Sequence, residues 1–174
     1  PANVGPVADN AMSGVKATIA LVADQFVGLK PTGQPQIARI LESTPGPEQL
    51  QPANFPMLAI ELSADEEHPW NSEAIGSPGL ARHDYTLKVF LFTGSPGTGT
   101  TIPQLHERTL AWIQPIAEKL FANLTLTSGV AFMGAGDGSA LVRYRIGGIR
   151  WNDTDFYGLI ITLPVTEKHR LTMA

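Results

Sequence analysis

Residues Gly94–Thr101, GSPGTGTT, come closest in type and spacing to a group that does chemistry. They follow an apolar, strand-like segment and precede a helix-like one. They match the phosphate-binding frame G-x-x-x-x-G-K-[ST] except at the lysine, where Thr100 stands. The missing lysine is the side chain that reaches the phosphates in such a loop. A glycine-rich turn with a threonine cap explains the stretch without a nucleotide, so a small nucleotide-binding domain built on Gly94–Thr101 is kept only as the weaker alternative.

Patterns for acid–base, metal or nucleophilic chemistry are weak in the rest of the chain. There is no cysteine, which excludes thiol nucleophiles and zinc–thiolate sites. The acidic run Asp65–Glu67 before His68 lacks the spacing of a calcium loop and is typical of a solvated loop. His106-Glu107 begins like H-E-x-x-H, but Leu110 takes the place of the second histidine. We therefore predict no catalytic residue, no metal site and no cofactor, in a protein that is not an enzyme.

Two arginines late in the chain form the clearest charged group. Arg143 and Arg145 are two positions apart in a strand-like segment, so their side chains point to the same face. Arg150 and the basic tail Lys168–Arg170 add positive charge in the same part of the chain. One interpretation is a solvated strand face that pairs with acidic residues of the same chain. The other is a charged stripe that faces a neighbouring subunit or the lumen of a ring.

Periodicity marks the elements that would position these residues. Residues 101–124 place apolar side chains at spacings of three and four and begin with a Thr-x-x-Gln capping box, which predicts a helix. Pro115 lies inside this range and predicts a kink, because proline removes one backbone hydrogen bond. Residues 85–92 are apolar on nearly both faces and predict a central strand.

The end of the sequence predicts a β-hairpin. Its arms lie within residues 141–166, its turn is at Asn152–Thr154, and Gly147–Gly148 marks a bulge or bend. Other predicted elements are a helix over 11–29 and strands over 36–42 and 57–62. We expect an α+β fold, in which two helices pack on a mostly antiparallel sheet that closes with this C-terminal hairpin.

Three long stretches separate these elements. They cover residues 43–56, 63–83 and 125–140. Loops beyond about 12–15 residues are usually functional or disordered. Apolar side chains in these stretches are Phe55, Trp70, Ile75, Phe132 and Met133. Flexibility would explain any one stretch, but for the three together we favour assembly, with Trp70, Phe132 and Met133 as candidate subunit contacts.

The composition is that of one folded domain with few charges. The chain has 174 residues, of which 43% are hydrophobic and 16% charged. We expect a single domain over 1–174, with an N-terminal arm at 1–10 and a C-terminal tail at 167–174. The net charge of −4 argues against a dedicated nucleic-acid binder. No apolar run reaches membrane-spanning length, so we expect a soluble protein without a membrane contact.

The order of the predicted elements resembles that of the tail terminator, or tail completion, proteins of long-tailed bacteriophages. In that family an N-terminal helix leads into short strands, then into a strand that feeds a second helix, and finally into a closing hairpin. The corresponding segments are 11–29, 57–62, 85–92, 102–124 and 141–166. The resemblance covers most of the chain and includes the final hairpin, LVRYRIGGIRWNDTDFYGLIITLPV.

This resemblance implies a structural virion protein at the tail–neck junction, assembled in the host cytoplasm. Members of the family form a hexameric ring that ends polymerisation of the tail tube protein and meets a head-side neck or connector protein. Genomic DNA passes through the lumen without sequence-specific binding, and no cofactor is implied. Arg143, Arg145 and Arg150 would face a neighbouring subunit or the lumen. The alternative of the same kind is another neck component, such as a head-closure or tail-tube-like protein.

Overall fold

The computed structural model describes residues 14–46, 49–72, 80–97, 99–127, 130–132 and 142–170. Its elements, in order, are α1 (Val15–Phe26), β1 (Arg39–Leu41), the 3-10 helix η2 (Pro52–Asn54), β2 (Met57–Leu62), β3 (Trp70–Ser72), β4 (Leu80–Gly94), α2 (Ile102–Ala122), β5 (Thr125–Thr127), β6 (Val130–Phe132), β7 (Arg143–Trp151) and β8 (Thr154–Arg170). The fold is α+β, as predicted: two α-helices of the described chain accompany a mostly antiparallel, eight-stranded sheet.

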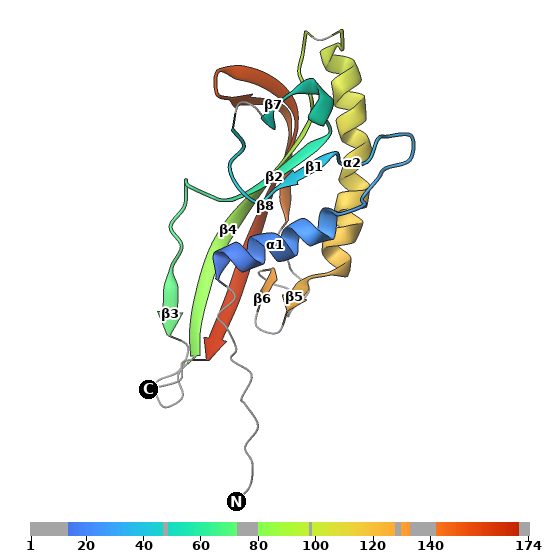
Figure 1. Ribbon diagram of the computed structural model, residues 1–174. Helices are drawn as coiled ribbons and strands as arrows, with labels where there is room; N and C mark the ends of the chain where they lie inside the picture. The colour runs from blue at the N-terminus through green and yellow to red at the C-terminus, as the bar shows by residue number, and fades with distance from the viewer. Residues whose placement is uncertain are drawn as a thin grey trace, which may run out of the picture.

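Two long antiparallel strands, β4 and β8, form the centre of the sheet (Figure 1). The outer edge of β4 pairs with β2 and β3, and the outer edge of β8 pairs with β7 and β6. β5 extends the sheet beyond β6, and β1 runs parallel to β2. The prediction of a central strand at 85–92 is therefore confirmed, although β4 is longer at both ends.

Both helices pack on one face of the sheet, where they bury the main core. Figure 1 shows α1 crossing in front of the two long strands, with α2 along one side. The alternate residues Leu87, Val89 and Leu91 of β4 point to this face, as period-two alternation requires. Other buried members are Phe26, Leu58, Ile60, Trp112, Ile116, Leu120, Leu159, Ile161 and Leu163. We call this side the covered face.

The opposite side, which we call the open face, has a smaller apolar cluster at one end. Phe90 and Phe92 of β4 pack there with Ile149 and Phe156 of the hairpin. The loop that contains η2 covers this end, and the indole Nε1 of Trp151 donates to the carbonyl oxygen of Pro45 at 3.1 Å.

The start of α2 follows its sequence signals closely. The N–H of Thr101 donates to Oε1 of Gln104 at 2.9 Å, so the predicted capping box is present. The helix continues without interruption through Pro115 to Ala122. α1 ends at Phe26, before the predicted limit at residue 29, because Val27 already has extended backbone angles.

The closing hairpin is confirmed, with one difference in its detail. Asn152 and Asp153 have φ of 46° and 59°, the left-handed geometry that a two-residue hairpin turn requires. The pairing of β7 with β8 runs without a register shift past Gly147 and Gly148, so of the bulge or bend expected there, the bulge is absent. β8 also continues to Arg170, and the predicted tail at 167–174 therefore begins as strand.

Two of the three predicted loops contain strands. The stretch 63–83 includes β3 and the start of β4, and the stretch 125–140 includes β5 and β6. β3 forms by pairing with the end of β4 and β6 by pairing with the end of β8, whereas β5 pairs with β6. The N-terminal arm at 1–10 lies outside the described residues. No helix in the described part of the chain has the length and apolar character needed to cross a membrane.

Candidate functional site on the open sheet face

The strand register gathers charged and apolar side chains on the open face. Lys88 of β4 lies opposite Thr162 of β8, which lies opposite Arg143 of β7. In the next row, Phe90 and Arg145 lie on either side of Ile160. Side chains in such rows are neighbours, since directly opposed residues in an antiparallel pair have Cβ atoms roughly 5 Å apart.

A hollow of about 550 Å³ lies over these rows. Its lining includes Lys88, Phe90, Arg143, Arg145, Arg150, Trp151, Ile160 and Asp65. Trp151 meets Phe90 edge to face, with ring centroids 5.3 Å apart. The hollow thus combines a fixed aromatic and aliphatic floor with cationic side chains at its border.

The cations at this border differ in whether they have a partner. Lys88 Nζ donates to Oδ2 of Asp65, and this hydrogen bond and the lysine charge lower the pKa of the Asp65 carboxyl. Arg150 pairs with Asp153, 3.5 Å away at the hairpin turn. Arg143 and Arg145 are exposed, and neither forms an ion pair with any residue in the described ranges. Within the described part of the chain, no acidic side chain pairs with these two arginines, as a simple solvated face would require.

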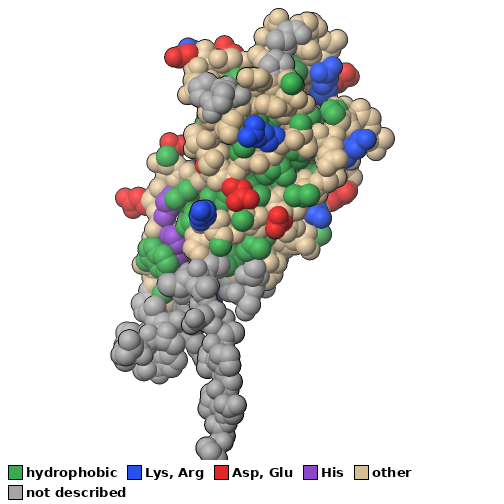
Figure 2. Space-filling model, in the orientation of Figure 1, with side chains coloured by type: hydrophobic (Ala, Val, Ile, Leu, Met, Phe, Trp, Pro, Cys, Tyr) green, Lys and Arg blue, Asp and Glu red, His purple; other side chains and the backbone are tan. Residues whose placement is uncertain are grey.

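Trp70 belongs to a polar group at the far end of the covered face. Its ring stacks on His83 with centroids 4.0 Å apart and an interplanar angle of 7°. His83 in turn packs beside Tyr85, whose hydroxyl donates to Oε2 of the buried Glu167 at 3.3 Å. Burial raises the pKa of Tyr85. Figure 2 shows histidine side chains beside a hydrophobic patch at this end, and Trp70 itself is 57% exposed.

Phe132 is a core residue, which corrects its assignment to a loop at a subunit contact. It lies in β6 opposite Val165, and its side chain is 1% exposed. The pairing of β6 with β8 turns the phenyl ring inward, against the covered-face core. Met133, the other candidate from this stretch, lies outside the described residues.

Lys88 and Ile160 were missed as site residues by sequence reasoning. Each looks like an ordinary position of a strand, and only the register across β4, β8 and β7 places them beside Arg143 and Arg145. The available signal was the odd–even alternation, which puts Lys88 on the face opposite Leu87 and Val89.

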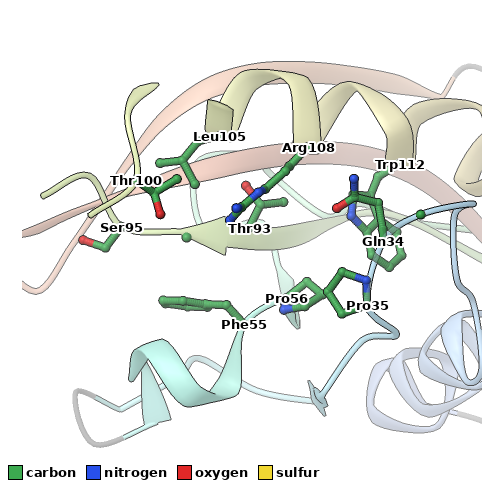
Figure 3. A pocket seen from close by; sticks show the side chains of 12 residues that line it. Gln34, Pro35, Phe55, Pro56, Thr93, Ser95, Thr100, Leu105, Arg108 and Trp112 are labelled. Atoms are coloured by element: carbon green, nitrogen blue, oxygen red, sulfur yellow. The ribbon is translucent and has the colours of Figure 1, made fainter. Parts of the chain in front are cut away.

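A second hollow, of about 510 Å³, lies beside the glycine-rich turn after β4 (Figure 3). The figure shows Arg108 of α2 reaching over Thr93, with Phe55 and Pro56 on the opposite wall. The hydroxyl of Thr93 is already bonded to Thr109 at 2.8 Å and to the carbonyl oxygen of Tyr157 at 3.0 Å. This hydroxyl is therefore already engaged within the fold.

The turn itself differs from a phosphate-binding loop in its setting. β4 is antiparallel to both β2 and β8, whereas a P-loop follows a strand of a parallel sheet. Gly97 and Gly99 have φ of 96° and 80°, so the glycines meet a backbone requirement. A Cβ at Gly94 would lie 2.6 Å from Cδ2 of Leu105, which gives this residue a packing reason as well.

Comparison with known proteins adds no family to this geometry, since the chain matches no protein-family model and no curated protein. Among the described residues, no three His, Asp or Glu side chains are placed so that they could hold a metal ion. The open-face hollow offers guanidinium groups and an apolar floor, which is chemistry suited to binding an acidic, partly apolar surface.

Proposed function

We propose that this chain is a structural virion protein of the tail terminator kind. In this role it forms a ring at the tail–neck junction, ends growth of the tail tube and meets a head-side neck protein. The observation that carries the proposal is the order of elements: helix α1, strands β1 and β2, the strand β4 that feeds α2, and the closing hairpin β7–β8. This is the layout on which the resemblance to the family rests.

The surfaces of the chain fit a ring subunit. A closed ring needs a contact between two different surfaces of the same protein, repeated at each subunit. The open face presents Arg143 and Arg145 without ionic partners among the described residues. Leu110 and Phe121 of α2 are exposed on the helix side. An apolar group on one side and a cationic hollow on the other give the chain two distinct places for contact.

The proposal is tested by light scattering of the purified protein, followed by negative-stain imaging of any large species. We expect a closed ring with a central channel, either for the protein alone or after it is mixed with tail tubes. Tubes capped at one end would support the terminator role, and rings that bind only a head-side connector would indicate another neck component. The absence of both rings and tube binding would overturn the proposal.

A further inference from the structure

The outward surface of α2 carries two parallel rows of exposed side chains, one apolar and one acidic. Leu110 and Phe121 are 46% and 50% exposed and stand eleven positions apart, about three helical turns, so they lie on one line. Glu107 and Glu118 have the same separation and each precedes one of these residues by three positions. The result is an apolar row with an acidic row beside it, roughly 16 Å long.

The acidic row is free to meet a partner. Glu118 accepts a hydrogen bond from Gln114 Nε2 at 2.7 Å, within the same helix. Neither Glu107 nor Glu118 forms an ion pair with any residue that the structure describes. The basic residues Arg108 and Lys119 of the helix each follow one of these glutamates by one position, a rotation of about 100°, so they lie off the acidic row.

The hollow on the open face has the complementary chemistry. It places the side chains of Trp151 and Ile160 beside Arg143 and Arg145, which pair with no described acidic residue. Trp151 and Ile160 are both half-buried, which leaves apolar surface for a partner. An apolar row with glutamates on one copy therefore matches an apolar floor with arginines on another.

We infer that the outward rows of α2 in one copy dock into the open-face hollow of the next copy, with Glu107 and Glu118 meeting Arg143 and Arg145. The two surfaces lie on opposite faces of the sheet, so they cannot meet within one chain. Each copy offers both, and the contact repeats from copy to copy until it closes. This inference deepens the ring-forming role proposed above and rests on it.

A second copy fits the hollow better than a nucleic acid does. The chain has a net charge of −4, and the Asp65 carboxylate already lines the hollow beside Lys88. The floor is apolar, whereas the electrostatic part of nucleic-acid binding depends on phosphates meeting a basic surface. An acidic helix with exposed apolar side chains uses both the cations and the floor.

Two charge-reversed variants of the full chain test this contact. One carries Arg143→Glu with Arg145→Glu on the open face, and the other carries Glu107→Arg with Glu118→Arg on α2. Like charges facing one another across the contact should weaken self-association of each variant by about 100-fold or more. An equimolar mixture should regain assembly with the two variants alternating, because the α2 glutamates of the first meet the open-face arginines of the second, and the introduced arginines of the second meet the introduced glutamates of the first. Light scattering and native mass spectrometry measure both results.

Matched controls separate this contact from a general charge effect. Lys16→Glu with Lys30→Glu repeats the first charge change at exposed sites elsewhere, and Asp24→Arg with Glu42→Arg repeats the second. Both controls should assemble as the unmodified protein does. Circular dichroism and denaturation confirm that each variant is folded.

The outcomes distinguish the contact from the proposed function. Rings formed by either charge-reversed variant alone would overturn the contact and leave the terminator role intact. Assembly recovered only when the two variants are mixed, combined with open fibres of the unmodified protein that ignore tail tubes, would support the contact and overturn the terminator role. If the open-face variant assembles normally but loses retention of double-stranded DNA in a low-salt gel shift, the occupant of the hollow is nucleic acid and the inference fails. No association in any sample, with or without tubes, would overturn both.

Discussion

The two faces of the central strands have the same backbone but very different surroundings. On the covered face, Leu87, Val89 and Leu91 are fully buried beneath α1 and α2. On the open face, the loop with η2 covers only one end, so Phe90 is buried while Ile160 and Trp151 remain half-buried. Alternation therefore assigns each residue to a face of the sheet. Whether that face becomes core or remains an exposed contact surface depends on which segments of the chain pack over it.

The largest expected effect comes from a substitution at Gly158, because this residue lies in the central ladder of β4 and β8 that supports both faces. A Cβ at Gly158 would lie 1.8 Å from the carbonyl oxygen of Leu91, so Gly158→Ala must push β4 and β8 apart. We expect a loss of about 4 kcal/mol or more in the free energy of unfolding, measured by chemical denaturation. Gly148→Ala is the matched control, because its nearest contact would be the Phe156 oxygen at 3.9 Å. Equal effects from the two substitutions would contradict the close approach at Gly158.

A pair of neighbouring isoleucines in β8 measures the difference between the faces directly. Ile161 is fully buried on the covered face, and Ile160 is half-buried on the open face. We expect Ile161→Ala to lower the free energy of unfolding by about 3 kcal/mol, because it leaves a cavity in the main core. Ile160→Ala should cost about 1 kcal/mol in the monomer, since that site is already partly hydrated. Similar losses of unfolding free energy for the two variants in urea denaturation would mean that Ile160 is as well buried as Ile161.

The smallest expected effect concerns the charges on the open face. Lys88→Met removes the partner of Asp65, so the pKa of this carboxyl should rise to its ordinary value. The lowered pKa means that the pair stabilises the fold at pH above the ordinary value of an aspartate. This contribution disappears as the pH falls through the lowered pKa. A pH titration of the Asp65 carboxyl followed by NMR checks the shift.

Lys119→Met provides the control for that titration, because Lys119 is an exposed lysine on α2. It should leave the Asp65 titration unchanged. A titration curve of Asp65 that is the same with and without Lys88 would show that the two groups do not interact in solution.

The sequence was sufficient for the elements that carry a local signal. The helix that follows the N-cap Thr101 has its capping box, the turn at Asn152–Asp153 has residues that tolerate positive φ, and β2 has apolar residues at alternate positions on one face, so all three were predicted. The short strands β3, β5 and β6 were missed because each has three residues and depends on pairing with a neighbour, β3 with β4, β6 with β8 and β5 with β6. Phe132 was misplaced for that reason.

The candidate site was predicted only in part. Arg143 and Arg145 could be placed on one face from their spacing, because alternation is a local property. Their neighbours Lys88 and Ile160 come from two other strands, and no local pattern specifies the register that brings them together. That no described acidic residue pairs with the two arginines also depends on how distant segments pack. These features are properties of the tertiary structure.

The central ladder also has a consequence for biosynthesis. It joins Leu80–Gly94 to Tyr157–Arg170, so the first strand leaves the ribosome long before its partner exists. Closing so long a stretch of chain is slow, and until then β4 has an unpaired apolar edge that can template aggregation. We expect the β7–β8 hairpin, rather than either helix, to limit the yield of folded protein in cells. A chain that stalls before this hairpin would need a chaperone to remain soluble.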